Sequence, residues 1–182
     1  RPKNITSYNL RKSLGIDKPV KIDEPFQILG KVEEEDRQAL GVDVVGIFDR
    51  NTFWGNQNNG KYQPWKFKGI DMLIGEDFRY TTAENGDIFA YPKGNTSLKP
   101  SGKLPASGYF FDGILRSEPV DEDNLTPVED FKEQFCLMTD DDLYYIEKQA
   151  DEVYKNTEYG AIFAWAGGAL GDVAFLPGTA LE

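Results

Sequence analysis

The sequence predicts an α/β fold in which an antiparallel β-rich segment is inserted between two units of one helix followed by one strand. Apolar, β-branched runs at residues 42–48 and 159–166 indicate two strands, and each follows a segment with apolar residues at helical spacing. Residues 50–115 lie between the two units and differ in composition, being rich in Asn, Gly, Pro and aromatic residues. Two strands do not fill a layered sheet, so we expect residues 1–182 to be a single domain that is a fragment of a larger fold.

Two helices are predicted before the first strand, and the second of them forms the first unit with that strand. Residues 7–14 are typical of a short helix. Asp23 is the expected N-cap of a second helix, with Pro25 in its first turn, and Gly41 is the expected end of that helix. The run at 42–48 contains one charged residue, which indicates a strand buried on both faces.

The inserted segment predicts an antiparallel meander. Asn85-Gly86 separates two strand-like stretches, and this dipeptide is a strong hairpin signal. The strand-like patterns lie at residues 65–74, 78–83, 87–91 and 109–115.

The second unit begins with a capping signal. Thr139 followed three residues later by Asp142 resembles a capping box and predicts the start of a helix. The acidic triplet 140–142 fits the same position, because the helix macrodipole favours negative charge at an N-terminus. The second apolar run, 159–166, is the expected buried strand.

Composition excludes several classes of protein. The chain contains no histidine and one cysteine, which excludes a Ser-His-Asp triad, a Cys-His dyad, a structural zinc site and an internal disulfide. Residues 112–152 contain 14 acidic and 3 basic residues, a balance of −11 that equals the net charge of the whole chain. The sequence has no basic patch for nucleic acid and no apolar run for a membrane span. A lone thiol favours a reducing compartment, so we expect a cytoplasmic protein.

Candidate site residues follow each predicted strand. Asp49 comes directly after the first strand, and the carboxyl ends of strands hold the active sites of α/β folds. The alternative is an Asp that caps its own turn. The glycines Gly167, Gly168 and Gly171 follow the second strand and allow close approach of a ligand to the backbone, or else form a tight turn.

Aromatic residues form a second group of candidates. Phe53 and Trp54, together with Tyr62 and Trp65, are dense enough to form a stacking platform for a sugar or planar ligand. The alternative is that these rings anchor a long loop on the core.

Three segments of the chain resemble a known superfamily. They are GVDVVGIFDRNTFWG, EDFRYTTAENGDIFAYPKGNTSLKPSGKLPASGYFFDGI and AWAGGALGDVAFLPG, and they resemble the uroporphyrinogen decarboxylase-like superfamily, most closely its branch of corrinoid-dependent methyltransferase-like proteins. The most specific part is the ordered set TT-x-ENGD, YP-x-G, PSG and YFFD. The resemblance implies a (β/α)₈ TIM-type barrel with residues 50–115 over its mouth. A whole barrel needs about 250 residues, so this chain would form only part of one.

The resemblance also implies an activity for the parent protein. A methyltransferase of this branch moves a methyl group from a small methylated substrate to a corrinoid on a partner protein, with a zinc ion held by His and Cys residues. This chain has no histidine, so that zinc would be supplied from outside this span and no cofactor is expected within it. Asp49 and the glycines from Gly167 to Gly171 would line the pocket, and the chain alone is expected to be inactive.

Two alternatives remain open at this stage. One is a decarboxylase acting on a tetrapyrrole; in those enzymes the catalytic aspartate follows Phe-Ser, whereas here Asp49 follows Phe48 directly, and an N-terminal arginine-rich motif is missing. The other is a non-catalytic module that binds a glycan or a protein through its aromatic meander.

Overall fold

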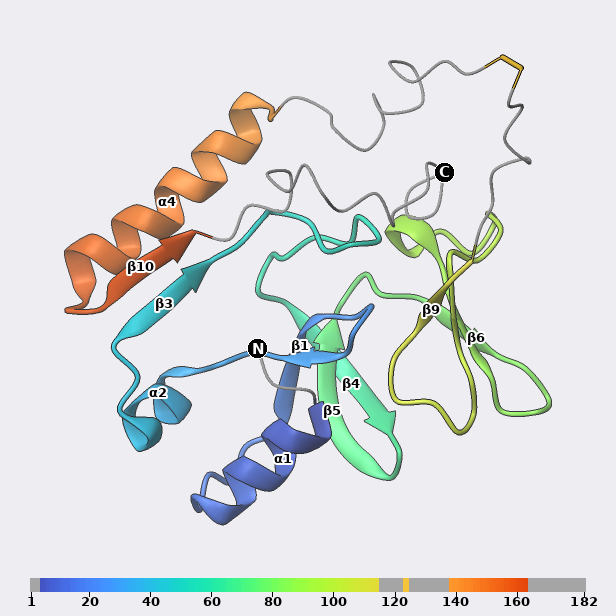
Figure 1. Cartoon of the computed structure of the whole chain (residues 1–182), viewed down its shortest axis with the longest axis horizontal. Coiled ribbons are helices and arrows are strands. Elements are labelled where there is room, and N and C mark those ends of the chain that lie inside the picture. The colour runs from blue at the N-terminus through green and yellow to red at the C-terminus, as the bar shows by residue number, and fades with distance from the viewer. Residues whose placement is uncertain (1–3, 115–122, 125–137, 164–182) are drawn as a thin grey trace.

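The computed structural model describes residues 4–114, 123–124 and 138–163, whose strands form three separate sheets (Figure 1). The first sheet is mixed, in the order β2-β1-β5-β4, and the second is antiparallel, in the order β6-β7-β8-β9. The third is the parallel pair β10-β3. The strands are β1 (Val20–Glu24), β2 (Leu29–Gly30), β3 (Val44–Ile47), β4 (Tyr62–Phe67), β5 (Ile70–Gly75), β6 (Tyr80–Thr82), β7 (Ile88–Ala90), β8 (Gly102–Leu104), β9 (Asp112–Gly113) and β10 (Gly160–Phe163).

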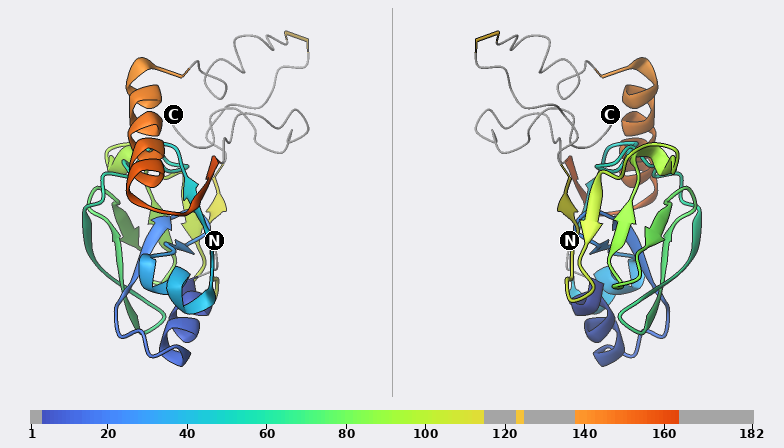
Figure 2. Two further views of the ribbon diagram at one scale, coloured as in Figure 1. Left: turned by 90° about the vertical axis from the view of Figure 1, so that its left-hand side faces the viewer. Right: turned by 90° about the vertical axis from the view of Figure 1, so that its right-hand side faces the viewer.

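Three α-helices accompany these sheets in the described part of the chain. They are α1 (Asn4–Ser13), α2 (Glu34–Leu40) and α4 (Asp140–Asn156), and a 3₁₀ turn spans Pro92–Gly94. Helix α4 lies along β10 and β3, away from the antiparallel sheet (Figures 1 and 2). Helix α1 lies beside β1 and β2.

The prediction of part of a (β/α)₈ barrel is wrong for the described residues. The three sheets are open, and five of the seven strand pairs are antiparallel. The physical reason is the length of the connections: a turn of two residues joins antiparallel strands, whereas a parallel pair needs a long crossover. Lys68 and Gly69, with φ of +50° and +79°, make such a turn between β4 and β5. The predicted strand at 65–74 is therefore a hairpin.

Other parts of the predicted meander are confirmed. The Asn85-Gly86 turn joins β6 to β7 in the register Tyr80↔Ala90 and Thr82↔Ile88. Strand β8 pairs with β7 and then with β9, which is the short strand found within residues 109–115.

The two α-then-β units are confirmed in their order and pairing. Strands β3 and β10 run parallel in the register Gly160↔Val44 to Phe163↔Ile47, so their carboxyl ends meet at one edge. The expected burial on both faces is wrong, because Ile162 and Phe163 are 55% and 45% exposed. Residues 164–166 of the second predicted strand lie outside the described residues.

The helix predicted from Asp23 to Gly41 is wrong in its first half. Residues 20–24 form β1, whose Val20 and Ile22 alternate into the core, and the helix begins only at Glu34. Its N-cap is Glu33, in a capping box with Asp36. The predicted end at Gly41 is confirmed, with a left-handed φ of +65°.

An aromatic core joins the mixed and antiparallel sheets. The Trp54 ring is fully buried, 4.9 Å from Phe111 in an edge-to-face arrangement and 6.3 Å from Phe78. Rings in such arrangements contribute stability beyond their buried area. Gly102 permits this packing, since an added Cβ would lie 2.2 Å from the Trp54 ring.

We expect Gly102→Ala to lower the free energy of unfolding by about 1–3 kcal/mol, because the added methyl group overpacks a fully buried ring. Gly113 is its cross-strand partner and has nothing within 4 Å of an added Cβ, so Gly113→Ala is the matched control. Urea unfolding of both variants measures the difference. Equal stability of the two variants would contradict this account of the core.

A buried ion-pair network fixes α1 against α2. Arg11 is 3% exposed, and its Nε donates to Asp36 Oδ1 at 2.8 Å while its Nη2 donates to Glu33 Oε2 at 3.2 Å. Its Nη1 donates to the carbonyl of Pro19 at 3.2 Å. Asp36 also accepts from the Glu33 N–H at 2.8 Å, which completes the capping box.

This network predicts a loss of stability in acid. Burial on its own would raise the pKa of Asp36, but hydrogen bonds from Arg11 and from the Glu33 N–H, with the charge of Arg11, lower it overall. A lowered pKa contributes stability that is present above the unfolded value of about 3.9 and is lost as pH falls through the folded value. Asp36→Asn should lower the free energy of unfolding at pH 7 by about 3 kcal/mol, because it removes the more buried of the two carboxylates that compensate the buried Arg11.

Thermal melts of Asp36→Asn between pH 2 and 7 measure this effect. The control is Glu35→Gln, which removes an exposed pair with Lys18 and should change stability by less than about 1 kcal/mol. A similar loss in both variants would show that Arg11 is satisfied without Asp36.

Candidate functional site

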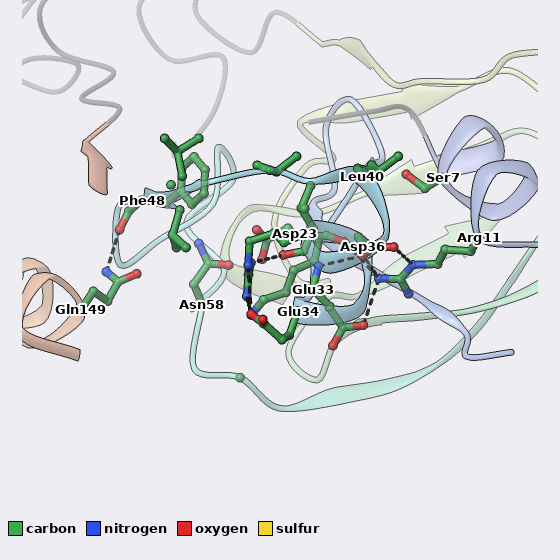
Figure 3. Close-up of a pocket in the computed structure, with 18 of the residues that line it drawn as sticks. Ser7, Arg11, Asp23, Glu33, Glu34, Asp36, Leu40, Phe48, Asn58 and Gln149 are labelled. Carbon is green, nitrogen blue, oxygen red and sulfur yellow. Dashed lines mark hydrogen bonds and ion pairs between the residues drawn. The ribbon is translucent and has the colours of Figure 1, made fainter. Parts of the chain in front are cut away.

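A pocket of about 650 Å³ lies where α1, α2, β3 and α4 face β1 and β4 (Figure 3). This volume is in the range of small-molecule sites. Arg11 and Ser7 lie at one end, and Phe48 and Gln149 lie at the other, with Asp23 and Asn58 between them. Apolar side chains from Val42, Val44, Val45 and Phe48 contribute to the lining along β3.

Helix α4 is attached by one hydrogen bond to the carboxyl end of β3 and by another to the segment between β3 and β4. Gln149 Nε2 donates to the carbonyl of Phe48 at 3.0 Å, and the Tyr145 hydroxyl donates to the carbonyl of Asn58 at 2.8 Å. Burial, and then the negative charge of Asp23, raise the pKa of the Tyr145 phenol. These contacts close the pocket at the end where β3 and β10 terminate.

Asp49 directly follows Phe48, which lines this end of the pocket, but Asp49 itself is not among the lining residues. It follows β3 at the shared carboxyl edge of the parallel pair, next to Phe48, and its backbone carbonyl accepts from Asn58 Nδ2 at 3.1 Å. Burial is the main cause that raises the pKa of the Asp49 carboxyl, and the negative charge of Asp142 adds to it. Asp49 therefore lies at the carboxyl edge of the parallel pair, as predicted from the sequence. The environment of the Asp49 carboxyl favours its protonated form.

The aromatic candidates belong mainly to the core. Trp54 is 0% exposed, and Phe53 stacks on Phe26 with ring centroids 4.6 Å apart. Glu24 fixes this region, because its two carboxylate oxygens accept from the backbone N–H groups of Phe26 and Phe53, each at 3.0 Å. Neither Phe53 nor Trp54 lines the pocket.

The remaining sequence candidates have different outcomes. Gly167, Gly168 and Gly171 lie outside the described residues. The capping box of Thr139 and Asp142 is confirmed: Thr139 Oγ1 accepts from the Asp142 N–H at 3.2 Å, and Asp142 Oδ2 accepts from the Thr139 N–H at 3.0 Å.

Several pocket residues escaped the sequence analysis. Arg11 and Asp36 are part of ordinary amphipathic helices in the sequence, and Asp23 is a plausible N-cap. Tyr145 lies on a helix whose apolar spacing gives no sign that its hydroxyl reaches Asn58, 87 positions away. Only tertiary structure brings these groups together.

The described residues do not provide a zinc site. Within residues 4–114, 123–124 and 138–163, no group of three His, Cys, Asp or Glu side chains is arranged to hold a metal ion. The zinc that the family resemblance implies therefore does not fit the residues that the structure describes. In the same part of the chain, no helix has the length and apolar character needed to span a bilayer.

Comparison with protein-family models, with curated proteins and with solved structures finds no match to this chain.

The raised pKa of Asp49 makes a prediction about stability. A raised folded-state pKa contributes stability that is present below the unfolded value of about 3.9 and is lost as pH rises through the folded value. Asp49→Asn mimics the neutral carboxyl group, so we expect it to raise the urea midpoint at pH 7. The gain should shrink toward zero below about pH 4, where the wild-type carboxyl is protonated in both states.

Asp71→Asn is the control for this experiment, because the Asp71 side chain is 85% exposed. It should leave the midpoint nearly unchanged at both pH values. A lower midpoint for Asp49→Asn at pH 7 would show that the ionised carboxylate stabilises the fold, contrary to the arrangement described.

Proposed function

We propose that this chain contributes a small-molecule site to an enzyme similar to the uroporphyrinogen decarboxylase-like superfamily, in its methyltransferase branch. The observation that carries the proposal is the partly buried Asp49 carboxyl, at the carboxyl edge of β3 and β10 and directly after the pocket-lining residue Phe48. Active sites of α/β folds lie at this edge. Perturbed carboxyl groups beside pockets are also typical of proton-transfer sites.

The role proposed for Asp49 is that of a general acid. When the bond between a methyl group and a heteroatom breaks, the electron pair stays on the heteroatom, which becomes a better leaving group if it receives a proton. A carboxyl group with a raised pKa retains that proton nearer to neutral pH. Asp49 would donate it and become a carboxylate, while the methyl group passes to the acceptor.

The pocket would hold the substrate while this proton moves. Its apolar wall along β3 suits a small methylated molecule, and Tyr145 and Gln149 close the end beside Asp49. The resemblance implies a corrinoid protein as partner, whose corrinoid supplies the methyl acceptor. No step is assigned to zinc, because the described residues do not fit it. A cytoplasmic location is part of the same proposal and is supported by the single cysteine.

The burial of the tryptophans favours this proposal over a glycan-binding module. A stacking platform needs rings that face solvent, whereas Trp54 and Trp65 are 0% and 3% exposed. In a Trp165→Phe variant, whose fluorescence comes from Trp54 and Trp65 alone, acrylamide quenching should accordingly be weak.

The test begins with the open reading frame that encodes the chain. We expect it to continue beyond residue 182 and to encode a His-x-Cys motif and a later Cys, the ligands that a zinc methyltransferase needs. The full-length protein, assayed with methanol, trimethylamine and dimethyl sulfide as methyl donors and cob(I)alamin as acceptor, should form a cobalt–carbon bond detectable by its absorbance.

In that protein, Asp49→Asn should lower kcat by about 10²–10⁴-fold, the usual contribution of a general acid. Asp71→Asn is the matched control and should retain full activity. A stop codon directly after residue 182 would refute the proposal, as would methyl transfer that is unaffected by Asp49→Asn. Decarboxylation of uroporphyrinogen in place of methyl transfer would assign the protein to the other branch.

A further inference from the structure

A second, much smaller cavity lies behind the Asn-rich segment that follows β3. It has a volume of about 20 Å³ and lies between residues 52–62, β1 and the end of β5. Its lining includes Thr52, Asn56 and Asp77. A cavity of this size holds one water molecule or one ion.

Three buried side-chain oxygens in this lining have no hydrogen-bond partner within the described part of the chain. They are Thr52 Oγ1, Asn56 Oδ1 and Asp77 Oδ1. The Asn56 side chain is almost completely buried, with the residue 2% exposed. Buried acceptors without partners are rare in folded proteins, because each loses its contacts with water and gains nothing in return.

The neighbouring hydrogen bonds hold these oxygens in place. The Thr52 N–H donates to the Asn56 carbonyl at 2.8 Å, and the Gln57 N–H donates to Asp77 Oδ2 at 2.8 Å. Asn56 Nδ2 donates to the Asp77 carbonyl at 3.3 Å. The segment is therefore fixed to the end of β5 by groups other than the three unpartnered oxygens.

The charge of Asp77 distinguishes a cation from a water molecule. Among the described residues, no Lys or Arg forms an ion pair with Asp77. A buried carboxylate oxygen needs compensation of its charge as well as a hydrogen bond. A water molecule supplies only the hydrogen bond, whereas a cation supplies both. Asp23 and Lys61 also line the cavity, and the Lys61 ammonium pairs with Glu76 at 3.5 Å.

We propose that Thr52 Oγ1, Asn56 Oδ1 and Asp77 Oδ1 are ligands of one hard cation, for which calcium is the best chemical match. Carboxylate, amide and other neutral oxygens are the ligands that calcium takes in proteins, and its coordination geometry is flexible. Main-chain carbonyls and water complete the coordination sphere. The proposal is independent of the methyltransferase proposal, since it uses neither Asp49 nor a substrate.

A cation bound in the small cavity would also affect the larger pocket, because the two cavities share lining residues. Asp23, Asn58, Gly60 and Tyr62 line both cavities. A cation at the small cavity would therefore order the segment that forms one wall of the large one.

Calcium titration of the EDTA-treated chain tests the proposal. We expect millimolar CaCl₂ to raise the melting temperature by at least about 2 °C relative to EDTA, as binding to the folded state alone requires. Terbium, a luminescent substitute for calcium, should show emission sensitised by Tyr62, which lines the cavity, and calcium should displace it.

Two variants distinguish the cation from a buried water molecule. Asp77→Asn keeps the shape of the side chain and should abolish the calcium-dependent shift. Asn56→Asp adds a carboxylate to the site and should strengthen calcium binding about tenfold while lowering the melting temperature in EDTA, because two buried carboxylates then repel each other. The control, Asp71→Asn, removes an exposed carboxylate and should leave the calcium shift unchanged.

The melting curve of each variant in EDTA reports whether it folds, so a folding failure is not mistaken for loss of binding. A wild-type melting temperature that is equal in calcium and EDTA would overturn the proposal and assign the cavity to water. A calcium shift that persists in Asp77→Asn and does not grow in Asn56→Asp would place the calcium elsewhere on the acidic surface.

Discussion

The buried guanidinium of Arg11 is the interaction on which the N-terminal half of the structure depends. A buried charge persists in a folded protein only when it is paired and hydrogen-bonded, and Arg11 takes its partners from Glu33, Asp36 and the carbonyl of Pro19. Pro19 directly precedes β1, Glu33 directly precedes α2, and Asp36 lies in α2. One side chain of α1 therefore determines where both following elements lie. Because β3 begins only a few residues after α2 ends, the apolar wall of the large pocket takes its position from the same network.

Helix α4 determines the opposite end of the pocket through contacts that are distant in sequence. Gln149 reaches the carbonyl of Phe48 across 101 positions, and Tyr145 reaches the carbonyl of Asn58 across 87. Asp142, at the start of the same helix, is the acidic residue that helps to raise the pKa of Asp49. The perturbed carboxyl group is thus produced by the packing of α4 on the parallel pair, not by residues adjacent to it in the chain.

Local sequence signals were sufficient to predict those turns and helix ends whose conformation depends only on adjacent residues. The Asn85-Gly86 turn and the capping box at Thr139 depend on a few adjacent residues, and both are found as expected. Asp23 satisfies the same local rule for an N-cap, yet it lies in β1, because the alternation of Val20 and Ile22 into the core extends the strand through Glu24. The barrel expectation came from the family resemblance, and it failed because most strands of the described residues pair with close neighbours in the chain through antiparallel hairpins, in sheets that stay open. Asp49 was found because its position depends only on where β3 ends.

Several polar groups held under unfavourable conditions lie in or next to the segment that follows β3, although Ser7 Oγ and Trp65 Nε1, which also lack a partner among the described residues, lie elsewhere. Asp49 has a partly buried carboxyl group beside an acidic neighbour, and the small cavity contains three oxygens without hydrogen-bond partners among the described residues. By contrast, the most buried charge, that of Arg11, is fully compensated. Asn58 connects the two unfavourable places: it donates to the Asp49 carbonyl, accepts from Tyr145 and lines both cavities. Folding alone does not favour such arrangements, and natural proteins keep them where binding or catalysis requires them. The polar groups that Asn58 connects therefore make this end of the pocket the place where the proposed function is best tested.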